Sequence, residues 1–245
     1  MLGRTHAATG WCAGLALAPA LGAHTLPQAV VVATVTAGSA LLPGLDHPGS
    51  RASRLVAPLT RPLSAVVQGL SAAVYRLTRG RADEYGSGEH RHLTHTLAWA
   101  ALLGGGVSWW TVSAGTWAVV AVLLVALMLA VDALGDWLLP VAVAALVLGL
   151  AHGGQLAAVS GWLGIAVGAG CLVHCLGDAL TESGCPVLWP LPIRGETWYE
   201  IRPPRLVRFR TGGPAELGLV WPVCVVAGVL LLPGVWPLVM GLVAG

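Results

Sequence analysis

Eight histidines and a small set of carboxylates are the residues of this sequence whose types and spacing could perform chemistry. Most of them gather in three short groups, LPGLDHP at 42–48, HRHLTHT at 90–96 and HCLGDALT at 174–181, and His6 precedes them. His174 and Asp178 are four residues apart, which places both side chains on one face of a helix. Imidazole and carboxylate groups are ligands that zinc, manganese and iron accept. The groups therefore predict a metal site.

Each of these groups is expected to supply part of a metal-dependent reaction. We expect one or two divalent ions, zinc or manganese, and a water activated by the ion as the nucleophile. His90 and Arg91 are the catalytic candidates, His90 as a proton carrier and Arg91 as a two-point clamp for an anionic oxygen. Thr94 and Thr181 are expected to orient ligands through hydrogen bonds. The predicted metal ligands are His6, Asp46, His47, His95, His174 and Asp178.

The same residues have plain structural alternatives. Asp46 is also suited to a turn, in which its side chain accepts backbone N–H groups. His6 could be a polar residue in the membrane interface, and His90 could be a solvated loop residue. Arg91 could serve only as a topology anchor, and Thr94 is also suited to capping the helix that follows it.

Composition shows which kind of protein must position these groups. Apolar residues make up 56% of the 245 residues, charged residues only 10%, and the mean hydropathy is +0.77. A soluble domain carries about 25% charged residues, so this chain is too apolar to cover a water-facing surface. An ordinary soluble enzyme is thereby excluded, and an integral membrane protein is predicted.

The apolar residues fall into runs close to the length that crosses a bilayer, about 17–25 residues. The fold predicted is all-α, a polytopic transmembrane helix bundle of about seven spans, with six as the alternative count. It is expected to form a single membrane-embedded domain over residues 1–245, with polar segments at 43–94 and 182–216. The runs cover 7–22, 27–42, 96–112, 116–131, 137–151, 156–177 and 217–242.

The distribution of arginine predicts the orientation in the membrane. All 13 basic residues are arginines, and they lie before the first run or within the two polar segments. Seven spans with a cytoplasmic N-terminus place every arginine on the cytoplasmic side, in agreement with the positive-inside rule. The predicted location is therefore the bacterial inner membrane, with both polar segments and the metal groups at its cytoplasmic face.

The two polar segments are expected to contact the membrane surface. Leu63, Val66, Leu70 and Leu77 recur at helical spacing, which predicts an amphipathic helix on the inner leaflet, or alternatively one packed on the mouth of the bundle. The segment 182–216 is rich in proline and aromatic residues, which favours anchoring at the headgroups. Its alternative is a flap whose arginines, Arg202, Arg205 or Arg208, meet a lipid phosphate.

Taken together, these motifs resemble the YdjM-like family of bacterial inner-membrane proteins, which is described as metal-dependent hydrolases. The family pattern has a second Asp where this chain has Gly44, which removes one possible ligand and favours one metal over two. It also often has Pro where this chain has Glu182. The resemblance rests on His6, Asp46 with His47, 90–95, His174 with Asp178, 181–184 and 186–190.

The resemblance and the residues together predict an inner-membrane hydrolase that attacks an ester or phosphoester at the cytoplasmic face. Membrane lipids are the expected partners, a lipid-linked phosphoester is the expected substrate, and nothing in the sequence indicates nucleic-acid binding. Two alternatives stay open. One is a transporter of metal or small solutes, which predicts ionisable residues near the middle of spans. The other is a non-catalytic membrane protein with a degenerate metal site.

Overall fold

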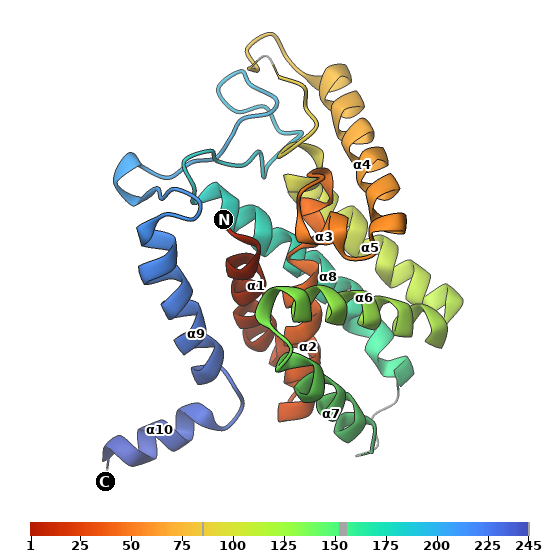
Figure 1. Ribbon diagram of the computed structural model, residues 1–245, viewed down its shortest axis with the longest axis vertical. Helices are drawn as coiled ribbons and strands as arrows, with labels where there is room; N and C mark the ends of the chain where they lie inside the picture. Colours follow the sequence, from red (N-terminus) through yellow and green to blue (C-terminus); the bar gives the residue numbers. More distant parts are fainter. Residues whose placement is uncertain (85, 152–155, 245) are drawn as a thin grey trace.

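The computed structural model describes residues 1–84, 86–151 and 156–244, and it confirms the all-α prediction (Figure 1). Over these residues no strand forms, and the only β pairing is in three isolated bridges. Short 3-10 turns, labelled η, connect several helices. The α-helices are α1 Gly3–Leu17, α2 Leu26–Ser39, α3 Arg51–Arg54, α4 Ala57–Thr78, α5 Leu97–Ala114, α6 Thr116–Leu134, α7 Leu138–Ala151, α8 Leu156–Ala179, α9 Trp221–Leu230 and α10 Val235–Ala244.

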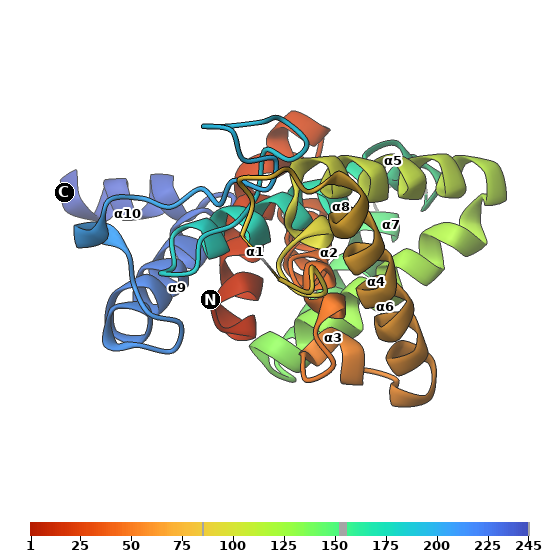
Figure 2. The same ribbon diagram turned by 90° about the horizontal axis from the view of Figure 1, so that it is seen from above.

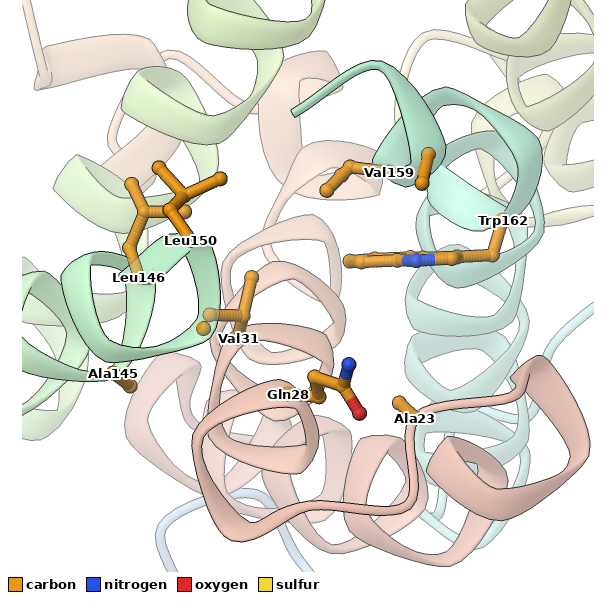
Figure 3. A pocket seen from close by; sticks show the side chains of 10 residues that line it. Ala23, Gln28, Val31, Ala145, Leu146, Leu150, Val159 and Trp162 are labelled. Atoms are coloured by element: carbon orange, nitrogen blue, oxygen red, sulfur yellow. The ribbon is translucent and has the colours of Figure 1, made fainter. Parts of the chain in front are cut away.

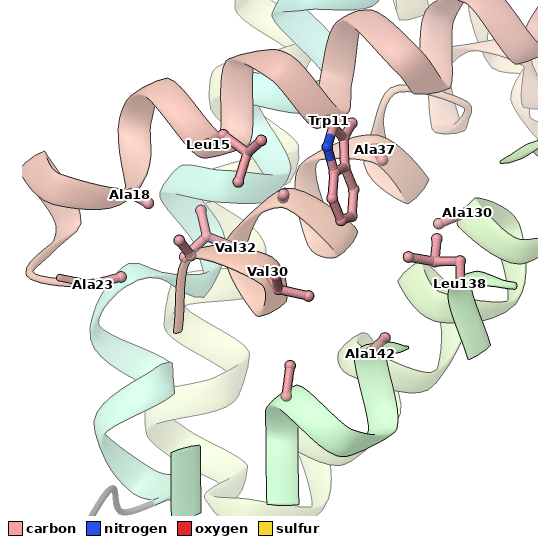
Figure 4. Close-up of a cluster of buried hydrophobic side chains, with 13 residues drawn as sticks. Trp11, Leu15, Ala18, Ala23, Val30, Val32, Ala37, Ala130, Leu138 and Ala142 are labelled. Carbon is pink, nitrogen blue, oxygen red and sulfur yellow. The ribbon is translucent and has the colours of Figure 1, made fainter. Parts of the chain in front are cut away.

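Helix α2 lies at the centre of the bundle, and α1, α6, α7 and α8 pack around it. Its sequence is rich in Ala and Val, and ten of its 14 residues are buried. The approach of α1 is close because a Cβ added at Gly14 would lie 2.6 Å from the Cα of Ala33. Small residues allow such backbone contact in membrane helices. Figure 4 shows the resulting core, in which Trp11 and Leu15 of α1 face α2 and Leu138 of α7.

Helices α5 and α8 cross at their glycines. A Cβ added at Gly104 would lie 2.7 Å from the carbonyl oxygen of Gly164 and 3.2 Å from the Cα of Gly168. These are the glycines that small-residue packing requires. Because α8 is held tightly along this contact and against α2, its last turns, which carry His174 and Asp178, are fixed in position.

The helices include several that are long and apolar enough to cross a membrane. By length and composition these are Leu26–Asp46, Thr116–Leu134 and Ala158–Ala179. A fourth span is counted if the bent pair Glu216–Leu230 and Val235–Leu242 is one span. Helices α1 and α7 are shorter, with 15 and 14 residues. The count of seven spans is not confirmed and stays a prediction.

The apolar run over 217–242 forms two helices, α9 and α10. The chain bends by 92° between α9 and α10. The break falls at Pro233, which has no N–H to continue a helix, and at Gly234, whose φ of 90° is left-handed.

The predicted amphipathic helix is α4, and its apolar face points away from the protein. Its inward face is made of Ser64, Ser71, Ala72 and Tyr75 with one valine. The outward face carries the exposed apolar side chains Leu59, Leu63, Val66, Leu70 and Leu77. This arrangement favours contact with lipid over packing on the bundle mouth.

The segment 182–216 runs mostly as irregular chain at the top of the view in Figure 1, next to the loop that follows α4, and Figure 2 shows it from above. Trp198 is buried and stacks on Trp189 with 4.7 Å between ring centroids. Trp198 also lies 5.5 Å from Tyr75 of α4. The ring of Trp198 is therefore covered by other aromatic rings, and anchoring of the segment 182–216 at the headgroups stays a prediction.

A small cavity of about 90 Å³ lies beside the first turns of α2. Gln28 and Trp162 face this space together with aliphatic side chains of α7 and α8 (Figure 3). Gln28 also completes a capping box with Thr25 at the first turn of α2. The side chain of Gln28 therefore caps the start of α2.

Candidate metal centre

Four separate segments bring ionisable side chains to one buried place at the cytoplasmic end predicted from the sequence. His6 comes from the second turn of α1, and His174 and Asp178 come from the last turns of α8. Asp46 ends the 3-10 turn η2, Leu42–Asp46, and His95 ends the 3-10 turn η3, Leu93–His95. All five side chains are buried. Buried ionisable groups require partners or a metal.

Three of these residues form a group that could hold a metal ion. His6, His174 and Asp178 each offer one ligand atom, and the three atoms lie within 4.8 Å of one another. The Nε2 atom of His6 is 3.1 Å from Oδ1 of Asp178. The Nε2 atom of His174 is 3.7 Å from Oδ2 of the same carboxylate. Asp178 thus lies between the two imidazoles.

His95 approaches the same group from the other side. Its Nε2 is 3.1 Å from Nε2 of His174 and 3.4 Å from Oδ2 of Asp178. Two facing Nε2 atoms and a carboxylate oxygen are the donor types that divalent transition metals bind.

Partners outside the group set the tautomers of the two facing imidazoles. Nδ1 of His174 donates to the carbonyl oxygen of Ala40 at 2.6 Å, which leaves the lone pair on its Nε2. Nδ1 of His95 lies 2.9 Å from the hydroxyl oxygen of Thr94, which itself donates to Asp46, and 3.3 Å from Oδ2 of Asp46. This is the arrangement of a metal-binding histidine held from behind by a carbonyl or a carboxylate.

Asp46 is surrounded by hydrogen-bond donors. Its Oδ1 is 2.8 Å from Nδ1 of His90, and its Oδ2 accepts from the Thr94 hydroxyl at 2.7 Å and from the backbone N–H of Arg91 at 2.9 Å. Arg91 adopts the left-handed conformation, with φ of 59°, at this point. Asp46 therefore lies behind His95, and the His95 ring separates it from the group of His6, His174 and Asp178.

The two carboxylates change the titration of His95. Burial alone would lower the pKa of its imidazole, but the charge of Asp46 and hydrogen bonds with Asp178 and Asp46 outweigh burial. The pKa of His95 is raised to about 10. A positive charge at this position therefore balances the buried carboxylates, and a metal ion bound at Nε2 would replace that proton and supply the charge instead.

Arg91 reaches the centre from the side. One terminal nitrogen of its guanidinium is 3.4 Å from Oδ2 of Asp178. The other terminal nitrogen, NH1, is buried and has no hydrogen-bond partner among the described residues. A buried donor without a partner is costly, so this nitrogen is suited to binding an oxygen of a ligand.

The other predicted site residues, His47, His90 and Thr181, lie outside the group of His6, His174 and Asp178. His47 is exposed, and its Nδ1 accepts from the N–H of Gly49 at 3.1 Å. Its ring lies 4.9 Å from that of His90, whose side chain is 43% exposed. The hydroxyl of Thr181 donates to the backbone carbonyl of Asp178 at 2.7 Å, so it caps the end of α8 and does not contact the carboxylate.

A polar cavity of about 490 Å³ opens over the centre. His6, His95, His174 and Asp178 are at its floor. Three arginines line it, Arg51, Arg54 and Arg91. Arg51 is paired with Asp132 at 2.7 Å. The cavity is therefore suited to an anionic ligand, whereas Arg202 and Arg208 of the predicted flap line a separate cavity.

Several residues that hold the centre carry weak sequence signals. The amine of Met1 forms an ion pair with Asp178. Glu216 is buried and accepts the N–H groups of Leu2 and Gly212 at 2.7 Å each, which ties the π-helical turn Glu216–Val220 before α9 to the start of α1. The thiol of Cys185 donates to the carbonyl of His95 at 3.0 Å. Among these residues, only Glu216 has a sequence signal, because it is an acid at the start of a helical segment.

Comparison with known proteins identifies the family. The family model described as YdjM inner membrane protein matches residues 1–147 and 137–237. The chain belongs to the YdjM inner membrane protein family. This confirms the resemblance found in the motifs, and the family together with the apolar helices indicates a membrane location. No curated protein and no solved structure matches the chain.

Proposed function

We propose that this member of the YdjM family is a metal-dependent hydrolase of the inner membrane that acts on an ester or phosphoester at the cytoplasmic face. The observation that carries the proposal is the buried cluster of His6, His174 and Asp178, with ligand atoms within 4.8 Å of one another. It lies at the floor of a polar cavity lined by arginines. A cluster needed only for packing would not require either the convergence or the cavity.

The donor chemistry of the centre fits one divalent ion, zinc or manganese. His6, His95, His174 and Asp178 would hold it, and the tautomer of His174 already directs a lone pair inward. When bound, such an ion supplies Lewis acidity and activates water near neutral pH. Asp46 is saturated by protein donors, so we assign it to orienting His95 in place of direct ligation.

The chain's own side chains would bind the substrate and move the proton. The unpartnered NH1 of Arg91 would donate to an anionic oxygen of the substrate. His90 is held at Nδ1 by Asp46, which leaves its Nε2 available at the open side to carry a proton. Asp178 keeps Arg91 directed into the cavity through the contact at 3.4 Å.

A membrane lipid or another lipid-linked phosphoester is the substrate that we favour. The exposed apolar face of α4 supports residence at a bilayer surface, and the arginines of the cavity support an anionic head. The positive-inside distribution supports a multi-pass chain with a cytoplasmic N-terminus.

Metal analysis of the purified full chain tests the proposal. We expect about one bound ion per wild-type chain and its loss in His174→Ala, because metal binding needs the complete ligand set. The matched control is His24→Ala, since His24 is exposed and outside the cluster. Hydrolysis of bis(p-nitrophenyl) phosphate is measured on the same samples. A wild-type chain that binds no stoichiometric metal, or a metal content unchanged by His174→Ala, would refute the proposal.

A further inference from the structure

Helix α9 packs on α1 at the edge of the bundle (Figure 1). An apolar groove lies between α9 and the neighbouring helices. The groove has a volume of about 540 Å³ and is bounded by α1, α2, α7 and α9. Binding sites for small molecules occupy about 300–1,000 Å³. The apolar groove is lined by Trp11, Trp137, Val141, Trp221, Val225 and Val229 among others.

Several side chains of the apolar groove are exposed and have no partner that covers them. Val141 and Val225 are 42% and 48% exposed, and Trp137 and Val229 are about half exposed. In water, contiguous apolar exposure of this kind marks an interaction site. Within a membrane the available occupant is a hydrocarbon chain.

The apolar groove and the polar cavity of the metal centre follow one another along α1. Gly3 and His6 line the polar cavity, whereas Ala8 and Trp11 line the apolar groove. Gly3 and Ala8 are five residues apart, which is about 7.5 Å along a helix. One amphiphilic molecule could therefore reach both spaces.

A cation and an aromatic ring lie at the edge of the apolar groove. The guanidinium carbon of Arg4 is 5.3 Å from the ring centroid of Trp221, and Arg4 is exposed. Trp221 itself lines the apolar groove. Arginine and tryptophan together are typical of the headgroup level of a membrane, and a guanidinium binds phosphate through two parallel hydrogen bonds.

We propose that the apolar groove binds one hydrocarbon chain of an anionic membrane lipid whose phosphate lies at Arg4 and whose head extends into the polar cavity. The inference rests on the proposed function for the reaction at that head. It adds the substrate class, a phosphate-bearing lipid with a hydrocarbon chain, and the place where the chain binds.

A second apolar groove serves as a control. It has a volume of about 490 Å³ between α4, α5 and α6, and none of its described lining residues comes from α1. Val125 lines this second groove and is 46% exposed, which closely matches the 48% of Val225 in the first. Val225→Trp and Val125→Trp therefore make the same change at equal exposure in the two grooves.

Photolabelling of the full chain in vesicles tests the proposal. The vesicles contain phosphatidylcholine with a small fraction of phosphatidic acid that carries a diazirine at the end of one acyl chain, and labelled residues are mapped by mass spectrometry. We expect saturable labelling of the apolar groove near Val225 and Val229. Val225→Trp should lower its apparent affinity about tenfold, the contribution of about two buried methylene groups. Val125→Trp should leave it unchanged.

A matched diacylglycerol probe examines the phosphate. Arg4→Gln should weaken labelling by the phosphatidic acid probe and leave labelling by the diacylglycerol probe unchanged. Equal labelling of both grooves, an unchanged result in Val225→Trp, or equal binding of the two probes would overturn the proposal. Metal content is measured in parallel. A wild-type chain without stoichiometric metal would refute the proposed hydrolase. Stoichiometric metal together with equal labelling of both grooves would refute only the proposed lipid site.

Discussion

Two buried carboxylates, Asp46 and Asp178, lie on either side of the His95 ring, and their surroundings differ. Asp46 is enclosed by donors, namely the Thr94 hydroxyl, the N–H of Arg91 and the ring of His90. Asp178 instead faces cationic groups and imidazoles, namely Nε2 atoms on two helices, one guanidinium and the amine of Met1. His95 lies between the carboxylates, with one ring nitrogen toward each.

The difference teaches which carboxylate is available for a metal. A carboxylate whose lone pairs are used by protein donors can orient a neighbour but has little capacity left for an ion. A carboxylate that faces imidazole nitrogens gains a cation as its natural partner. The Asp178 side is thus the ligand side, and the Asp46 side supports it.

The largest expected effect is that of Asp178→Asn. The amide is neutral and removes the charged ligand at the centre of the cluster, so metal affinity should fall well beyond the roughly 100-fold typical of losing a supporting partner. Affinity is measured by competition with a zinc chelator. Asp132→Asn is the control, because Asp132 belongs to an exposed ion pair. A modest loss, equal to that of the control, would contradict the assignment.

Asp46→Asn should have a smaller effect on the same measurement. The orienting partner of His95 is weakened while the ligands remain, so we expect a loss of about 10–100-fold in metal affinity. The order of the two variants is the informative result. A greater loss in Asp46→Asn than in Asp178→Asn would reverse the comparison.

Arg91→Lys should separate substrate binding from metal binding. Lysine retains the charge but not the planar fork of five donors, and hydrogen bonds to charged groups contribute about 1.5–3 kcal/mol. Hydrolysis of a phosphodiester should therefore fall at least about tenfold, with metal content unchanged. Both residues are non-glycine, so the left-handed backbone at this position is equally strained in each. Full activity in the variant would exclude the clamp.

The smallest effects distinguish the two threonines. Thr94→Val removes a donor to Asp46 and should weaken metal binding, whereas Thr181→Val should leave metal binding unchanged. Because Thr181 caps α8, its variant should instead lose about 1 kcal/mol of stability. Thermal unfolding in detergent and chelator competition are compared for both. Equal metal affinity in the two variants would show that the Asp46 side does not support the ligands.

The sequence was sufficient for the helical class because the apolar runs and the scarcity of charge allow little else. The spacing of His174 and Asp178 predicts a shared helix face, and the structure has them on α8. The division of labour between Asp46 and Asp178 was not predictable, since the donors around Asp46 depend on how 90–94 folds against it. Likewise, Ala40 offers only a backbone carbonyl to His174, which no residue type reveals.

The break in the final apolar run shows a different limit. Pro233 and Gly234 are visible in the sequence, but a proline also occurs within helices, as Pro62 does within α4. Here Pro233 is followed by Gly234, whose left-handed φ of 90° lies at the 92° bend between α9 and α10. The apolar groove that results could therefore not be expected from the pattern of hydropathy.

Anomalous diffraction at the zinc edge from crystals of the zinc-loaded full chain tests the central claim most directly. We predict one ion within about 2.0–2.2 Å of Nε2 of His174 and a carboxylate oxygen of Asp178, with the oxygens of Asp46 still on their protein donors. An ion bound between Asp46 and His90, or no anomalous peak among His6, His174 and Asp178, would contradict it.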